Sequence, residues 1–309
     1  MSGGAAGAPA PATVLVVSPA GPIREEVLDR GLEAAAQLGI PTEWPPGWRD
    51  SLLTRSGFFA GPDMARAACL SEALRLGPRH LWMSRGGYGC IRTLETTAQL
   101  AGGLFSGPPA TLWGFSDGTA LLAAWDRHGW PAWHGPPISQ LPRLDAPSRA
   151  RTLAAWATGE VPPFEGLEVQ VPGQATAPLA GGNLAVLASL VGTPWEADLR
   201  DRIVLLEDVG EAPYAIDRLL TQLILSGAFK KTLGFVIGAF TGLSDKATHE
   251  AHEVICERLV PLGLPMATGL PIGHDAANAP LPFGAGERRL AMLDVPHDGR
   301  AALRFEAPA

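Results

Sequence analysis

Short apolar runs alternate with longer amphipathic stretches along most of this chain. Residues 14–18 form the first apolar run, and residues 23–38 then carry apolar side chains at helical spacing until Gly39 ends the pattern. Strand-length runs that alternate with helix-length stretches are typical of βαβ units and of a mostly parallel sheet. The sequence therefore predicts an α/β fold.

A weakly patterned stretch with many prolines, residues 141–178, divides the predicted elements into two groups. A chain of 309 residues fits two domains, at roughly 100–200 residues each. We predict an N-terminal α/β domain at 13–140 with a mostly parallel sheet flanked by helices, a linker at 141–178, and a smaller C-terminal α/β domain at 179–309. Residues 1–12 lack the cationic and apolar segments of a secretory signal, and they are expected to be a disordered tail.

The same patterns predict the individual elements. Apolar periodicity indicates the helices, and short apolar runs between turn residues indicate the strands. The expected helices are 63–76, 91–100, 184–191, 213–226 and 247–262; the expected strands are 81–84, 111–113, 203–206, 233–240 and 266–272, with a closing hairpin of 289–295 and 301–305.

The composition argues against several classes of function. The net charge is −7 and the sequence has no cluster of Lys and Arg that could follow a phosphate backbone, so nucleic acid is not an expected partner. No run reaches the roughly 18 apolar residues of a membrane span, so we expect a soluble protein without a membrane partner. Cys69, Cys90 and Cys256 are too scattered for a disulfide framework or a Cys-x-x-Cys metal site, and they fit a reducing cytoplasm.

Two glycine-rich turns follow successive predicted strands. The first is Arg85-Gly-Gly-Tyr-Gly89, and the second is Gly114-Phe-Ser-Asp-Gly-Thr119. Ser116 would lie on a tight strand-to-helix turn with its hydroxyl exposed, and the glycine turn could offer backbone N–H groups to an oxyanion. This geometry suits acyl transfer. The alternative is that both are ordinary βα loops without a catalytic role, because such matches carry a risk of false positives.

A serine nucleophile needs a base, and the base needs an orienting group. His274 follows the predicted strand 266–272, where sites are built, although a histidine in a Gly/Pro loop can instead only bond its surroundings. Glu207 closes the apolar strand 203–206, and a charge at the end of a buried strand needs a partner. We rank Glu207 first as the group that orients His274. The competing acids nearby are Asp208, Glu211 and Asp217.

Two other motifs are weaker candidates. His249 and His252 could share one face of a helix, but no third zinc ligand is evident, and an exposed helix face is the simpler interpretation. The Arg85–Gly89 turn lacks the Gly-Lys-Ser/Thr ending of a P-loop and the first-strand position of a dinucleotide fingerprint. We therefore predict no metal and no cofactor.

Taken together and in order, the motifs resemble those of the LD-carboxypeptidases (murein tetrapeptide carboxypeptidases) and the related microcin-immunity serine peptidases. The resemblance extends from about residue 14 to residue 284. The motifs are Ser84-Arg-Gly-Gly-Tyr-Gly89, Gly114-Phe-Ser-Asp117, Gly181-Gly-Asn-Leu184 with Gly192-Thr-Pro194, Leu206-Glu-Asp-Val-Gly-Glu-Ala-Pro-Tyr214 with Asp217-Arg218, and Gly273-His274 with Leu281-Pro-Phe-Gly284.

The resemblance implies a catalytic triad of Ser116, Glu207 and His274. It also implies an oxyanion hole made by the N–H groups of Asp117 and Gly87. The site would lie in the crevice between two domains of a homodimer, and the chemistry would need no metal or cofactor. We therefore expect a cytoplasmic serine carboxypeptidase that cleaves an L–D peptide bond of a murein peptide and releases D-alanine in peptidoglycan recycling.

Arg85, Gly86 and Asn183 are the candidate substrate-binding residues. A guanidinium matches the geometry of a carboxylate, so Arg85 could hold the terminal carboxylate of the peptide, although a structural ion pair is an equal alternative. Residues 242–247 look short for the loop with which the microcin-immunity branch grips a nucleotide, and this favours a murein peptide over an aminoacyl-nucleotide compound.

Two further functions remain open at this point. Gly114-Phe-Ser-Asp-Gly118 literally matches the Gly-x-Ser-x-Gly motif of α/β-hydrolase esterases, and the order serine, acid, histidine is shared with them. A two-domain protein could also bind murein peptides in the same crevice without cleaving them. Esterase assays and covalent labelling of the serine would distinguish these alternatives.

Overall fold

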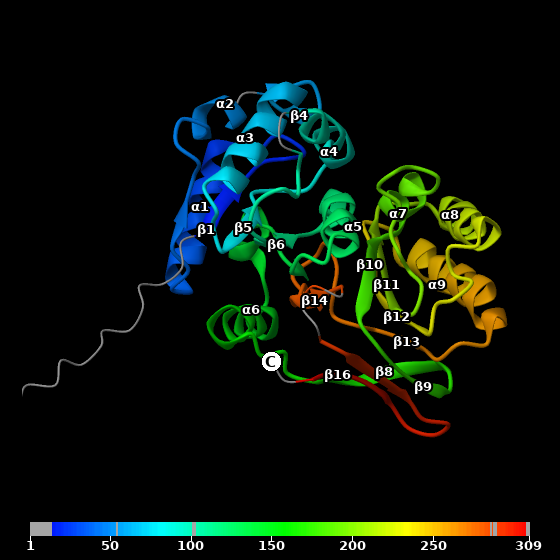
Figure 1. Cartoon of the computed structure of the whole chain (residues 1–309). Helices are drawn as coiled ribbons and strands as arrows, with labels where there is room; N and C mark the ends of the chain where they lie inside the picture. The colour runs from blue at the N-terminus through cyan, green and yellow to red at the C-terminus, as the bar shows by residue number, and fades with distance from the viewer. Residues whose placement is uncertain (1–13, 54, 101–102, 285, 287–288, 307–309) are drawn as a thin grey trace, which may run out of the picture.

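Two large β-sheets with helices packed against them make up most of the described part of the protein (Figure 1). The computed structural model describes residues 14–53, 55–100, 103–284, 286 and 289–306. The tail expected at residues 1–12 lies outside the described residues. The prediction of two α/β units is confirmed, with a mostly parallel first sheet and a second sheet that curves into a barrel-like form.

The first sheet has six strands in the order β14-β7-β6-β5-β1-β2. Its strands are β1 Val14–Val17, β2 Thr42–Glu43, β5 His80–Met83, β6 Thr111–Gly114, β7 Ala132–His134 and β14 Leu281–Phe283. All neighbours are parallel except β14 and β7. The accompanying elements are α1 Glu25–Gln37, α2 Arg49–Leu53, the hairpin β3 Arg55–Ser56 and β4 Phe59–Ala60, α3 Asp63–Arg75, α4 Cys90–Gln99, the 3-10 turns Ser116–Gly118 and Ile138–Arg143, α5 Thr119–Arg127 and α6 Ala146–Thr158.

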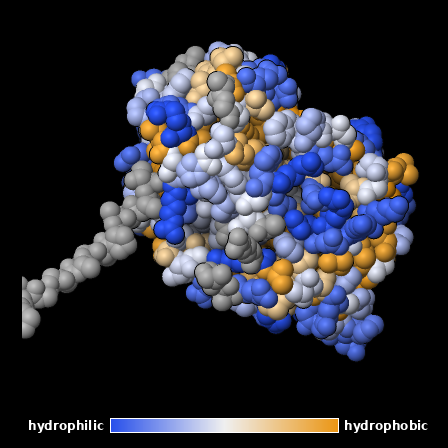
Figure 2. Space-filling view, viewed as in Figure 1, coloured by the Kyte–Doolittle hydropathy of each residue, from blue (hydrophilic) through white to orange (hydrophobic). Residues whose placement is uncertain are grey.

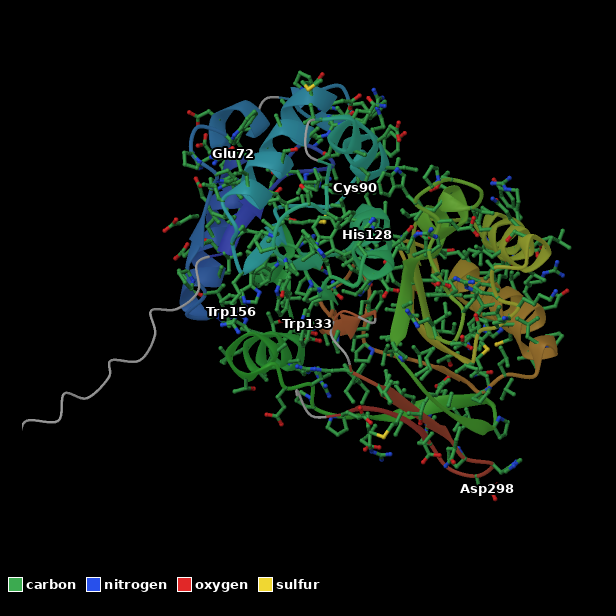
Figure 3. All side chains as sticks on the ribbon, in the orientation of Figure 1. Glu72, Cys90, His128, Trp133, Trp156 and Asp298 are labelled. Carbon is green, nitrogen blue, oxygen red and sulfur yellow. The ribbon has the colours of Figure 1, made fainter. Side chains whose placement is uncertain are left out.

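A group of tryptophans joins α6 to the first sheet. Trp113 and Trp133 stack with their ring centroids 4.9 Å apart, and Trp82 lies 5.1 Å from Trp113. Trp156 of α6 packs against Trp82 at 6.3 Å, and Figure 3 labels Trp133 and Trp156 at this junction. Because α6 buries this aromatic surface, it belongs to the first unit although its sequence falls in the expected linker.

The second sheet has eight strands in the order β10-β11-β12-β13-β8-β16-β15-β9, parallel from β10 to β13 and antiparallel beyond. Its strands are β8 Phe164–Val171, β9 Gly173–Ala177, β10 Leu179–Asn183, β11 Ile203–Val209, β12 Gly234–Thr241, β13 Met266–Thr268, β15 Ala291–Val295 and β16 Ala301–Phe305. The helices of this unit are α7 Leu184–Leu190, α8 Pro213–Ser226 and α9 Asp245–Leu259, which a 3-10 turn, Val260–Leu262, follows.

The linker prediction at 141–178 is wrong for most of its length. After α6 the chain forms β8 and β9, which pair with β13, β16 and β15 of the second sheet. Their weak apolar pattern has a physical reason, since most side chains of β8 are exposed or only partly buried. The predicted domain boundary also fails near the C-terminus. Strand β14 lies in the C-terminal half of the sequence, but it pairs with β7 of the first sheet. The second sheet, expected in the smaller domain, has more strands than the first.

Helix α5 connects the two units. It runs directly from the turn that holds Ser116, and every residue from Thr119 to Asp126 is buried. The Thr119 hydroxyl accepts a hydrogen bond from the backbone N–H of Asn183, at the end of β10, with a distance of 3.0 Å. Figure 1 shows α5 between the two sheets. The helix that follows the Ser116 turn is therefore fixed directly to the second unit.

The face in Figure 2 mixes hydrophilic and hydrophobic residues. In the part of the chain that the structure describes, no helix combines the length and the apolar character needed to cross a bilayer.

Candidate active site

Ser116 lies on a strained turn at the carboxyl end of β6. Its φ is +60°, a conformation that residues other than glycine seldom adopt. The extended Phe115 precedes it, and a 3-10 turn leads from it into α5. Such strain is typical of functional sites, where the surrounding structure holds a residue in position. The expected strand-to-helix turn is therefore present.

Ser116, His274 and Glu207 lie in line across the junction of the two units. The Ser116 hydroxyl is 2.9 Å from Nε2 of His274, and Nδ1 of the same ring is 3.0 Å from Oε2 of Glu207. The first contact has the geometry of a hydrogen bond, whereas the second is a close polar contact that does not meet the angles of one. His274 follows an irregular segment, because the predicted strand 266–272 is regular only over β13.

Glu207 is fully buried at the end of β11. Burial raises the pKa of its carboxyl, His274 and Asn183 oppose this shift, and the neighbouring Asp208 reinforces it. The pairing of β11 with β12 shifts register between Leu206 and Asp208, and such a bulge redirects side chains. A buried carboxylate beside an imidazole can fix the ring and stabilise its charged form.

Two of the three competing acids, Asp208 and Asp217, have other partners. Asp208 accepts hydrogen bonds from the N–H groups of Ala185 and Val209 and from the side chain of Asn183, at 2.8–2.9 Å. Asp217 pairs with Arg258 of α9 at 2.9 Å. Both contacts are structural, which leaves Glu207 as the acid that touches His274.

Asn183, a candidate substrate-binding residue, makes hydrogen bonds within the protein. It is buried, its side-chain oxygen accepts from the Val186 N–H at the start of α7, and its side-chain nitrogen donates to Asp208. The side chain therefore caps a helix and holds Asp208.

The loop after β5 packs directly against Ser116. A Cβ added to Gly86 would lie 2.9 Å from Cβ and 3.2 Å from Oγ of Ser116, so only glycine allows this approach. Gly87 has a φ of +110°, which also favours glycine. The Asp117 carboxylate accepts from the N–H of Cys90 at 2.7 Å and so ties the two turns together. Burial raises the pKa of Asp117, although the bonds from Cys90 and Gly89 oppose this shift.

Comparison with known proteins agrees with this geometry. The family model of the LD-carboxypeptidase N-terminal domain matches residues 14–135, and that of the C-terminal domain matches residues 176–288. The chain belongs to the LD-carboxypeptidase family. Each match contains part of the line of contacts, Ser116 in the first and both Glu207 and His274 in the second.

Relatives of this family support the assignment over most of the chain. The murein tetrapeptide carboxypeptidase of Pseudomonas aeruginosa is 31% identical over 88% of this chain and 91% of its own length. The crystal structure of a muramoyltetrapeptide carboxypeptidase from Oxalobacter formigenes is 25% identical, covers 96% of this chain and 100% of its own, and has a TM-score of 0.77. The microcin C7 self-immunity protein MccF, in complex with aspartyl sulfamoyl adenosine, shares the fold with a TM-score of 0.77 over 97% of each chain, at 17% identity.

The other residues that the sequence singled out make contacts outside the Ser116–His274–Glu207 group. Arg85 is exposed, and one of its terminal nitrogens donates to the carbonyl of Pro22 at 2.5 Å. His249 contacts Glu253 one turn along α9 at 3.3 Å, as expected for an exposed helix face. Among the described residues, no group of three or more His, Cys, Asp or Glu side chains is arranged to hold a metal ion.

Sequence reasoning missed His134, which packs beside the site. It is fully buried at the end of β7, stacks on Phe283 with centroids 5.0 Å apart, and lies edge-on to Phe115 at 5.2 Å. Burial, together with the nearby charge of His274, lowers the pKa of His134 to about 3. A neutral ring therefore supports Phe115, whose own ring lies 4.5 Å from that of His274. No sequence pattern separated His134 from the other histidines.

Gly86→Ala is expected to lower kcat by about 10²–10³-fold, the effect of losing one oxyanion-hole donor. The new methyl group would push the loop away from Ser116 and displace the N–H groups that follow it. Steady-state kinetics would measure the loss. Gly107→Ala is the control, because a Cβ there would meet nothing nearer than 4.0 Å. Full activity of Gly86→Ala would show that the close approach is not needed.

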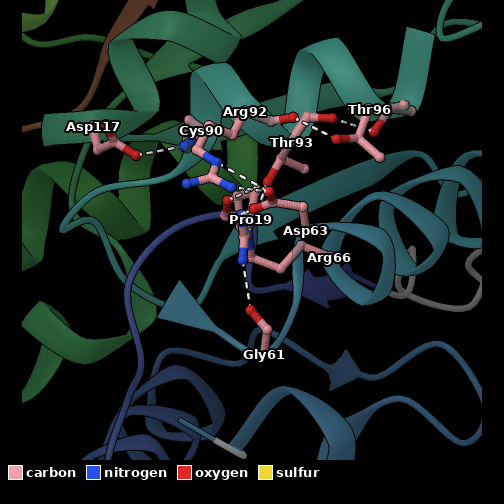
Figure 4. Close-up of polar contacts among 10 residues, drawn as sticks. Pro19, Gly61, Asp63, Arg66, Cys90, Arg92, Thr93, Thr96 and Asp117 are labelled. Carbon is pink, nitrogen blue, oxygen red and sulfur yellow. Dashed lines mark hydrogen bonds and ion pairs between the residues drawn. The ribbon is translucent and has the colours of Figure 1, made fainter. Parts of the chain in front are cut away.

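A buried arginine holds the segment behind this loop (Figure 4). Arg66 of α3 is fully buried, donates to the Gly61 carbonyl at 2.6 Å and the Thr93 hydroxyl at 3.0 Å, and pairs with Asp63. Thr93 donates in turn to the carbonyl of Pro19 at 2.7 Å, and Arg92 also pairs with Asp63. The network therefore joins α3, α4 and the loop after β1.

Asp63→Ala is expected to lower the free energy of unfolding by about 3 kcal/mol, because it leaves the buried Arg66 without its carboxylate. Burial raises the pKa of Asp63, but the bonds from Arg66 and Arg92 outweigh it and lower the pKa below 3.8. The contribution of a carboxyl with a lowered pKa is present above its unfolded pKa and is lost as the pH falls through the folded one. Denaturant unfolding at several pH values would measure both effects.

Glu72→Ala is the matched control for Asp63→Ala. Glu72 also pairs with an arginine three residues later on α3, but its partner Arg75 is exposed. An exposed pair contributes little, so this variant should unfold like the parent protein. Equal losses in both variants would contradict the importance of burial.

Proposed function

We propose that this protein is a serine carboxypeptidase that hydrolyses the L–D peptide bond before the terminal D-alanine of a murein tetrapeptide. The observation that carries the proposal is the contact of Ser116 with His274, and of His274 with Glu207, across the junction of the two units. The names of the relatives support this choice of substrate.

In the proposed mechanism, the Ser116 oxygen attacks the carbonyl carbon while Nε2 of His274 takes the hydroxyl proton. The backbone N–H groups of Asp117 and Gly87 hold the negative oxygen, and Glu207 stabilises the imidazolium. His274 then protonates the departing amine of D-alanine, which leaves an acyl group on Ser116. A water molecule gives a proton to His274 and attacks this ester, which releases the shortened peptide and restores the serine.

The test is mass spectrometry of the products from a murein tetrapeptide. D-alanine should be released, whereas the same peptide ending in L-alanine should be cleaved much more slowly. The esterase alternative predicts the opposite, with hydrolysis of p-nitrophenyl esters and no action on the L–D bond. A protein that only binds would be thermally stabilised by the peptide without turnover and without labelling by a fluorophosphonate.

The microcin-immunity activity is the second candidate, and the shared fold with MccF is the observation in its favour. The connection between β12 and α9 contains only residues 242–244, which favours the murein peptide. Parallel assays with the tetrapeptide and an aminoacyl sulfamoyl-adenylate would decide, and faster turnover of the adenylate would overturn the murein assignment.

We also propose that the protein works in the cytoplasm as a homodimer, in recycling of peptidoglycan. Its three cysteines are free, which fits a reducing compartment, and the family resemblance implies the dimer. One chain has a mass of 32.3 kDa, and light scattering after gel filtration should give twice that mass.

A further inference from the structure

The first sheet has a topological switch point between β1 and β5. From β1 the chain goes to β2 on one side of it and later to β5 on the other side. Ligands of open α/β sheets bind outside the carboxyl ends of the strands at such a point. The two loops meet there, because the Gly21 N–H donates to the Gly86 carbonyl at 3.1 Å and Arg85 donates to the Pro22 carbonyl.

A hollow of about 470 Å³ at this point is lined by four arginines and no carboxylate. Arg24 directly precedes α1 and Arg30 lies within it, Arg85 comes from the loop after β5, and Arg143 from the 3-10 turn after β7. Ser139 completes the wall, and its N–H donates to the Ser84 carbonyl at 2.9 Å. The four residues come from three segments that are far apart in the sequence, which is why the sequence did not show them as a basic cluster.

These four guanidinium groups are available to a ligand. None of them lies within 4.0 Å of a carboxylate of a described residue, and all four side chains are exposed. Arg30 and Arg85 each give one donor to a backbone carbonyl, and a guanidinium has five donors. The protein has a net charge of −7, but this hollow is positively charged and therefore attracts anions locally.

The neighbouring acids do not neutralise the hollow. Glu25 and Glu26 line an adjacent surface hollow together with Arg24 and Arg85. Glu25 is already paired with Arg49, at 3.0 Å. Glu26 then adds one carboxylate beside four arginines, so the local charge stays positive.

The hollow adjoins the candidate nucleophile. Arg85 is one residue, about 3.8 Å between Cα atoms, from Gly86. Gly86 in turn packs against Ser116, so the Arg85–Gly86 segment connects the wall of the hollow to the candidate nucleophile. A side chain that extends from the peptide over the Arg85–Gly86 segment would enter the hollow.

We propose that this arginine hollow binds a side-chain carboxylate of the peptide substrate. The proposal rests on the proposed function. The third residue of murein peptides is diaminopimelate, whose side chain ends in a carboxylate and an ammonium group, or lysine, whose side chain ends in an ammonium group alone. Guanidinium groups match the geometry of a carboxylate, and four of them repel a lone ammonium group. The enzyme therefore selects the diaminopimelate peptide.

The kinetic test compares two tetrapeptides that differ only in this third residue. The terminal carboxylate is common to both, so their ratio reports on the side chain alone. We expect kcat/KM for the diaminopimelate peptide to be about 10-fold higher, and the double variant Arg24→Gln/Arg143→Gln to reduce the ratio to about 2 or less, mainly through KM. Arg79→Gln, at the opposite end of β5, is the control and should keep the parent ratio. Equal turnover of both peptides by the parent protein, or an unchanged ratio in the double variant, would overturn the proposal.

A binding test separates the hollow from catalysis. Inorganic pyrophosphate is titrated by calorimetry into the Ser116→Ala protein, with and without the two arginine substitutions, at low ionic strength. We expect binding that weakens with added salt and at least 10-fold weaker binding in the variant with both substitutions. Absent binding, or equal binding with and without the arginines, would contradict an anion site. If the parent protein cleaves neither peptide, the proposed function fails, and this titration alone decides whether the hollow binds anions.

Discussion

Ser116→Ala is expected to lower kcat for the murein tetrapeptide by about 10⁶-fold while the protein remains folded. The hydroxyl is the only group that the substitution removes. It contacts His274 at 2.9 Å, and His274 in turn contacts Glu207. Binding of the peptide should persist, because the loop at Gly86 and its N–H groups are unchanged. Product analysis, calorimetry with the peptide and circular dichroism would measure the three properties.

Ser116→Gly separates strain from chemistry at the same position. Both variants lack the nucleophile, but glycine adopts the φ of +60° without the steric cost that serine and alanine share. Ser116→Gly should therefore be more stable than Ser116→Ala by about 1 kcal/mol. Ser189→Ala, an exposed serine on α7, is the control and should keep full activity and fluorophosphonate labelling at Ser116. Turnover by Ser116→Ala at the parent rate would refute the assignment.

Glu207→Gln is expected to reduce kcat by about 10³–10⁴-fold and to stabilise the protein. The amide cannot stabilise the imidazolium that forms when His274 takes the proton. The same change removes a fully buried carboxylate. Burial disfavours its negative charge and so raises the pKa of the carboxyl. We expect the Tm at neutral pH to rise by about 2–4 °C.

The pH dependence of the Tm provides a separate test of whether Glu207→Gln stabilises the protein. A carboxyl with a raised folded pKa contributes stability below its unfolded pKa, and this contribution is lost as the pH rises through the folded pKa. The advantage of Glu207→Gln should therefore be largest at neutral pH and vanish as the pH falls below 4.5, the ordinary value for glutamate. Melting curves between pH 4 and pH 8 would follow it. Glu211 lies outside the strand, so the control variant Glu211→Gln should have unchanged activity and Tm. A lower Tm of Glu207→Gln than of the parent protein would contradict the burial argument.

Local patterns were sufficient to predict much of the fold. The helix predicted at 213–226 is α8, because Pro213 suits a first turn and the apolar spacing continues to the end of the helix. The prediction failed where pairing partners are distant. β8 has few buried side chains, and it is a strand because β13 and β16 bond to its two edges.

The sequence by itself determined which chemical groups are available: a serine on a glycine-flanked turn, a carboxylate at the end of an apolar strand, and a histidine in a Gly/Pro loop. Those are local properties, since turn geometry and burial of a strand depend mainly on neighbouring residues. Only the tertiary structure decided that Asn183 caps a helix, that Asp208 is held by backbone N–H groups, and that four arginines from three segments line one hollow. These facts depend on contacts between residues far apart in the chain, and such contacts exist only when the two sheets are built and packed against α5.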